Sequence, residues 1–223
     1  MTRFRSNGRL PRIRTIVVVW VLGFMARPVV ASSILQFTFD ELNDHADLII
    51  EGRVVASQSR IDEPGGQIAT YVRIAVLERL KGPDVGSELE LRFSGGTVAG
   101  LSLEIADMRL PVVGEVGIYF VESLRERQVH PLVGWSQGHF VELNDTTTGR
   151  PGVFTAEGKA VLGIGRDVSV ARQRQVVPGT GTALEVQVEG AGVAPQAALA
   201  VSEFKDRIRR NIAALAADPV AKP

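Results

Sequence analysis

Apolar and polar residues alternate in six separate stretches of the chain, which is the pattern of half-buried β-strands. In residues 88–93, for example, every second side chain is Leu or Phe and those between them are Glu or Arg. The stretches cover residues 48–56, 70–80, 89–93, 101–105, 116–120 and 137–143. Gly- and Pro-rich turns separate them, and no β-helix-β rhythm occurs. The pattern therefore predicts a mainly β domain, built as an antiparallel barrel or sandwich.

Two segments have helical spacing instead. Thr38 and Glu41 form a capping-box pair ahead of a short apolar repeat, which predicts a helix over residues 39–46. Near the C-terminus apolar residues recur every three or four positions, which predicts an amphipathic helix over residues 199–216. This stripe consists of Val201, Phe204, Ile208, Ile212 and Leu215. We expect the helix to dock on the β domain, with association at a membrane surface as the alternative.

The N-terminus has the three-part layout of a secretory signal peptide. Five Arg residues precede an uninterrupted apolar run from Ile16 to Ala26, and Val29 and Ala31 stand at the −3 and −1 positions of a cleavage site. The run has 11 residues, whereas a stable transmembrane anchor needs about 20. We therefore expect residues 1–31 to be a cleaved signal and the protein to be periplasmic or extracellular. An uncleaved anchor is the alternative.

Composition changes once this signal is removed. Residues 1–31 carry six Arg and no acid, so residues 32–223 have 19 basic and 25 acidic residues and a formal net charge of −6. A mildly acidic protein is a poor partner for nucleic acid. The chain has no Cys, which excludes thiol catalysis, thiolate metal sites and a lipoprotein anchor. We expect residues 32–175 to form the β domain with an extension, and residues 176–198 a connector containing one strand at 184–188.

Residues Gly134–Gly138 match the G-x-S-x-G pattern of a nucleophile elbow around Ser136. An elbow requires a strand before the Ser, a helix after it, and an acid and a His further along the chain. No helical pattern follows Ser136, and the one downstream His, His139, is only three residues away. The motif therefore favours a turn into the last strand, with a serine hydrolase as the alternative.

Other chemistry-bearing residues have structural interpretations beside the functional ones. Asp40, Asp44 and His45 resemble metal ligands, although the helix dipole accounts for the acids. His45, His130 and His139 lack zinc-site spacing, and the Gly-rich segment 94–100 lacks the Lys of a phosphate-binding loop. Tyr119, Trp135 and Phe140 are either core residues or an exposed aromatic platform for a glycan or peptide. We therefore expect no catalytic residue, no metal ligand and no cofactor.

Three segments resemble the strands of netrin-like modules, the fold of the tissue inhibitors of metalloproteinases. They are Ala46–Val55, Tyr71–Gly82 and Val113–Phe120. The resemblance implies an OB-like five-stranded barrel, here over residues 47–143. Those inhibitors act through an N-terminal Cys and are held by disulfides, so their mechanism does not transfer to a chain without Cys. The order ADLIIEGRVV, LKG, GGTV, GWSQGHF is also similar to that of a group of exported bacterial proteins, and it implies no activity.

These observations favour a non-catalytic, exported binding module whose partner is another exported protein, for instance a secreted protease. A carbohydrate-binding accessory domain and an enzyme using Ser136 are the alternatives. Neither nucleic acid nor a stable membrane anchor is expected.

Overall fold

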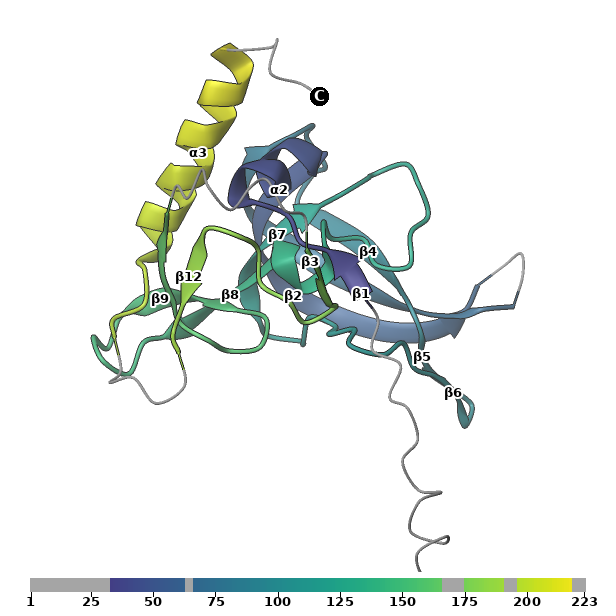
Figure 1. Cartoon of the computed structure of the whole chain (residues 1–223). Coiled ribbons are helices and arrows are strands. Elements are labelled where there is room, and N and C mark those ends of the chain that lie inside the picture. Colours follow the sequence, from purple (N-terminus) through teal and green to yellow (C-terminus); the bar gives the residue numbers. More distant parts are fainter. Residues whose placement is uncertain (1–32, 63–65, 166–174, 191–195, 218–223) are drawn as a thin grey trace, which may run out of the picture. The chain divides into compact units, whose positions relative to one another are not determined.

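The computed structural model describes residues 33–62, 66–165, 175–190 and 196–217. The predicted signal peptide, residues 1–31, lies outside this range. Most described residues that belong to regular elements lie in antiparallel strands (Figure 1). The predicted mainly β, antiparallel class is therefore confirmed.

One six-stranded sheet dominates the fold, and each pair of neighbours in it is antiparallel. Its order is β4 (Glu88–Ser94), β3 (Ile68–Lys81), β2 (Leu48–Ile61), β7 (Val116–Val121), β8 (His139–Asn144) and β9 (Pro151–Thr155). β2 and β3 are 14 residues each, and their register shifts at three places, including Glu51/Gly52. Such irregularities bend long strands. The sheet is open, with β4 and β9 at its edges, and no closed barrel is found among the described strands.

Three pairs of short strands complete the β structure. They are β1 (Ser33–Leu35) with β11 (Val176–Pro178), β10 (Val161–Ile164) with β12 (Val186–Val188), and β5 (Gly96–Val98) with β6 (Leu101–Leu103). A short 3₁₀ turn, η1 (Trp135–Gly138), leads into β8. The segment expected to be a connector thus contains β11 as well as β12, the strand expected near residues 184–188.

Opposite faces of the sheet carry separate hydrophobic clusters, because successive side chains of a strand point to opposite sides. On β2, Ile49 belongs to the first cluster, whereas Leu48 and Ile50 belong to the second. The first cluster is closed by α2 (Phe39–His45) and α3 (Val201–Ala217). The second lies among β2, β3, β4 and β7.

Both predicted helices are present. The capping box is formed, since Glu41 N–H donates to Thr38 Oγ1 at 3.0 Å and Thr38 N–H donates to a Glu41 carboxylate oxygen at 2.9 Å. α3 contacts the first cluster through Phe204 and Ile208, both fully buried. The docked position of α3 therefore agrees with the expectation from its apolar stripe. No described helix has the length and apolar character needed to cross a membrane.

Candidate functional site

A dense polar cluster lies where the β2–β3 hairpin turns. β2 ends at Ile61, and Asp62 closes the hairpin by donating its backbone N–H to Gln67 O at 2.8 Å. In the neighbouring pair of strands, Tyr71 of β3 lies directly opposite Arg92 of β4. Both therefore project from the same face of the sheet, opposite to Val72 and Phe93 of the second hydrophobic cluster.

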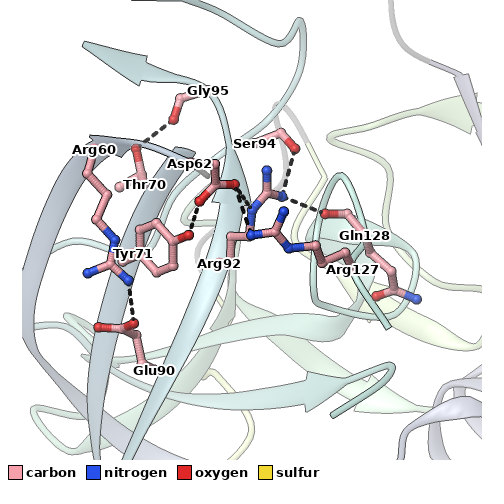
Figure 2. Close-up of polar contacts among 10 residues, drawn as sticks. All are labelled: Arg60, Asp62, Thr70, Tyr71, Glu90, Arg92, Ser94, Gly95, Arg127 and Gln128. Atoms are coloured by element: carbon pink, nitrogen blue, oxygen red, sulfur yellow. Dashed lines mark hydrogen bonds and ion pairs between the residues drawn. The ribbon is translucent and has the colours of Figure 1, made fainter. Parts of the chain in front are cut away.

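Asp62 is the centre of this cluster, and only 4% of it is exposed. Figure 2 shows its carboxylate between Tyr71, whose hydroxyl donates to one oxygen, and two arginines that face the other oxygen. Arg92 Nε lies 2.6 Å and Arg127 Nη2 lies 3.6 Å from Asp62 Oδ2. The hydrogen bond from Tyr71 lowers the pKa of Asp62, and the bond and charge of Arg92 lower it further against the effect of burial. The carboxylate is therefore held ionised.

A second aromatic–ionic contact extends the cluster along the strands. The guanidinium carbon of Arg60 lies 3.4 Å from the centre of the Tyr71 ring, a cation–π geometry. Arg60 Nη2 also lies 3.0 Å from Glu90 Oε1 (Figure 2). Tyr71 is thus held by Asp62 at its hydroxyl and by Arg60 on its face, which orders the surface of β3 and β4.

Arg92 ties the cluster to the loop between β7 and β8. Its Nη1 donates to Ser94 Oγ at 3.2 Å and to the backbone oxygen of Gln128 at 3.1 Å. Between β4 and this loop lies a groove of about 250 Å³, lined by residues 89–92, residues 123–128 and Pro131. We call it the arginine groove, because Arg92, Arg125 and Arg127 line it, together with Glu90 and Glu126.

Another titratable cluster lies beside α3. Lys205 Nζ lies 2.6 Å from Glu51 Oε2 and 2.9 Å from Glu78 Oε2. Burial raises the pKa of Glu142 to about 7, and the adjacent Glu51 carboxylate adds to the shift. Glu142 Oε1 is buried without a hydrogen-bond partner among the described residues. A cavity of about 630 Å³ lies here, with Glu51, Arg53 and Glu142 in its lining.

Ser136 does not stand in a nucleophile elbow. It lies in η1, which continues into β8 of the antiparallel sheet, and only 5% of it is exposed. Among the described residues neither Ser136 Oγ nor His139 Nδ1 has a hydrogen-bond partner. An elbow presents its hydroxyl at a strand-to-helix turn. The geometry therefore lacks both the exposed hydroxyl and the Ser–His contact of that motif.

The three histidines lie in three different environments. His139 Nε2 lies 2.6 Å from Glu115 Oε1, and both side chains are buried. His130 stacks on Trp135 with ring centroids 5.5 Å apart, and burial lowers its pKa to about 3. His45 meets Phe37 edge-on. Asp40, from the alternative metal set, accepts a hydrogen bond from Asn211. No group of three His, Asp or Glu side chains suited to a metal ion is found in the described part of the chain.

An exposed platform of Tyr119, Trp135 and Phe140 is wrong. Tyr119 is fully buried and Phe140 is 2% exposed, because both belong to hydrophobic clusters. Trp135 is only partly exposed and is stacked on His130. Their burial agrees with the other interpretation, core packing.

The arginine groove was not predicted from the sequence. The alternating pattern places Tyr71 and Arg92 on the polar faces of their strands, yet it does not show that they lie opposite each other. Asp62 and Arg127 are separated by 65 positions in the sequence and meet only because the loop folds back on β4. The polar residues Asp62, Tyr71 and Arg92, each near a strand end or on a polar face, were the available signal.

Comparison of the chain with protein-family models, curated proteins and solved structures finds no match.

Proposed function

We propose that this protein is a non-catalytic, exported binding module that recognises an acidic group of another exported protein at the arginine groove. Residues 1–31, which have the layout of a signal peptide, support export. The groove supports recognition of an anion, because guanidinium groups form paired, charge-assisted hydrogen bonds with carboxylates.

The observation that carries the proposal is that the three arginines of the groove differ in exposure and in ion pairing. Arg92 is 16% exposed and is neutralised by Asp62. Arg127 keeps 58% of its side chain exposed and lies 3.6 Å from the same carboxylate. Arg125 is exposed and has no ion-pair partner within the described residues. Asp62 and Arg92 therefore hold the site together, while Arg125 and Arg127 are available to a ligand.

An OB-like arrangement of the sheet is part of the same proposal. The bulged strands β2 and β3 and the order β4-β3-β2-β7-β8 are consistent with a partly open barrel of this kind. OB folds bind ligands on their second and third strands and on the loops after the first and fourth. In this chain those are β3, β4, the β2–β3 connection and the loop at 122–134. Of these, β4 and the loop line the arginine groove, while Asp62 pairs with Arg92 and Arg127.

Isothermal titration calorimetry of the purified protein with a glutamate-rich peptide tests the proposal. Arg127→Gln is expected to weaken binding by about 5–10-fold, the loss of one charge-assisted contact. Arg73→Gln is the matched control, because Arg73 is 53% exposed, is also on the sheet surface and lies outside the groove. Equal weakening by both substitutions, or an unmodified protein that does not bind, would refute acidic recognition at this site.

A further inference from the structure

The outer edge of β4 is open where the arginine groove runs along it. β4 pairs with β3 alone, in an unbroken register from Ala69–Ser94 to Ala75–Glu88. The backbone of Ser87 accepts from Val76 N–H of β3, and Gly95 N–H donates to Ile68 O, so odd-numbered residues bond inward. The N–H of Ser94 points the other way and donates to Val129 O at 2.9 Å.

This alternation assigns the direction of the remaining backbone groups. Because hydrogen-bonding direction repeats every second residue in an antiparallel strand, the N–H and C=O groups of Glu90 and Arg92 face the outer edge. Among the described residues, neither the Glu90 N–H nor the Arg92 N–H donates to a backbone oxygen across this edge. Residues 89–92 line one wall of the groove, and residues 123–128 line the other.

The edge strand β4 carries charged side chains at Glu88, Glu90 and Arg92, but it lacks two other devices that block an added strand. Proline and β-bulges are devices that keep another chain from pairing with a sheet edge. Residues 88–94 contain no proline, and the β3–β4 register shows no bulge. The backbone of the loop bonds to β4 only at Ser94, and Arg92 contacts the loop through its side chain, so the backbone edge at Glu90 and Arg92 stays open to the groove.

Charge identifies the chemistry of the occupant. Arg92, Arg125 and Arg127 line the groove together with Glu90 and Glu126. With the ion-pair partners Arg60 and Asp62 included, four arginines face three carboxylates. The local balance is thus positive, although residues 32–223 carry a formal net charge of −6. An extended segment with acidic side chains complements both the free backbone groups and the exposed Arg125 and Arg127.

We propose that an extended acidic segment of a partner protein binds in the arginine groove by adding a strand to the edge of β4. Backbone hydrogen bonds to Glu90 and Arg92 supply the pairing, as in other strand-addition complexes. Arg125 and Arg127 receive the acidic side chains. This inference rests on the proposed function and adds that the partner binds with an extended backbone.

Synthetic octapeptides of alternating Glu and Val test the mode of binding. In an added antiparallel strand only every second peptide N–H faces β4. N-methylation of one alternate set of amides is therefore expected to weaken binding more than tenfold, and N-methylation of the other set to change it less than threefold. Equal affinity of the two methylated peptides would overturn strand addition. If Arg127→Gln still weakens the unmodified peptide, the proposed acidic recognition survives that result.

A substitution in the protein gives a second, independent measurement. Glu90→Pro removes the outward N–H without removing a bond to β3, which is the position where an edge strand tolerates proline. Glu90→Ala is the matched control, because it removes the same carboxylate and keeps the N–H. Strand addition predicts that Glu90→Pro binds the peptide more than tenfold more weakly than Glu90→Ala, with both variants folded by circular dichroism. Equal binding by the two variants would refute it, and if Glu90→Pro does not fold, the methylated peptides decide.

Discussion

Two carboxylates, the buried Asp62 and the partly buried Glu142, have opposite electrostatic environments. Asp62 receives a phenolic hydroxyl and two guanidinium groups, so its pKa is lowered despite burial. Glu142 faces another carboxylate, Glu51, while Lys205 lies between Glu51 and Glu78. Burial and this like charge raise the pKa of Glu142 to about 7. The two groups therefore affect stability in different pH ranges.

The Glu142 carboxyl is expected to make the protein less stable as the pH rises from about 4.5 to about 7. In this range the folded state keeps a proton on Glu142 that the unfolded state releases, so the free energy of unfolding falls with pH. The contribution is fully present below the unfolded pKa and is lost as the pH rises through the folded pKa. Glu142→Gln, which stays neutral, removes it.

Urea unfolding at pH 5 and pH 8 measures this effect. We expect the loss of stability between these values to be smaller in Glu142→Gln than in the wild type by about 1–2 kcal/mol, after allowance for solvent screening. Glu157→Gln, which makes the same change of side chain at an exposed turn, is the control. Identical pH dependence of wild type and Glu142→Gln would contradict the raised pKa.

The sequence pattern predicts the polar contact between neighbouring positions but not those between distant ones. Thr38 and Glu41 are three positions apart, and their capping box follows from helix geometry alone. Asp62, Arg92 and Arg127 come from a turn, a strand and a long loop. Their convergence depends on strand order and register, which the alternation of residues does not specify. The candidate site could therefore be found only in three dimensions.

Among the elements, α3 is held on the β domain by two kinds of contact, one between aromatic rings and one between charged side chains. Phe204 packs edge-on against Phe39 at 5.5 Å between ring centroids and lies 4.7 Å from Phe140. Burial would lower the pKa of Lys205, but its hydrogen bonds to Glu51 and Glu78 raise it. The apolar residues supply most of the docking energy, because partly exposed ion pairs contribute little.

Phe204→Ala is expected to destabilise the protein by about 3–5 kcal/mol, the usual cost of deleting a buried aromatic ring. The measurement is the free energy of unfolding from urea titration. Arg210→Ala, on the exposed side of the same helix, is the control and is expected to change stability by less than about 0.5 kcal/mol. Similar effects of the two substitutions would show that α3 does not contribute to the core through Phe204.

The sequence pattern did not reveal five strands: β1, β5, β9, β10 and β11. Each of the six predicted stretches contains a strand. β1 and β11 have three residues each, and they form a strand pair through contacts between Ser33–Leu35 and Val176–Pro178. A segment this short has no readable period, so its conformation is determined by its pairing partner.

For the whole molecule, the pattern predicted the class of the fold and left its closure open. Alternation shows which residues of β4 and β8 are buried, but barrel closure depends on whether edge strands meet, a relation between distant segments. The described sheet ends at β4 and β9. The edge that remains at β4 is the one on which the proposed strand addition depends.

Export is a prediction that concerns the N-terminal segment together with the domain that follows it. The apolar run from Ile16 to Ala26 is too short for a stable anchor, and Ala31 is a small residue at the −1 position of the predicted cleavage site. Cleavage after Ala31 leaves Ser32 as the first residue and retains β1, which begins at Ser33.

When the chain is expressed in a bacterium with a secretion system, the intact mass of the periplasmic product is expected to match residues 32–223. Ala31→Tyr blocks recognition by the peptidase and is expected to leave the full chain in the membrane fraction. A wild-type protein that stays membrane-bound with residues 1–31 attached would identify the segment as an anchor, and the binding groove would then work at a membrane surface.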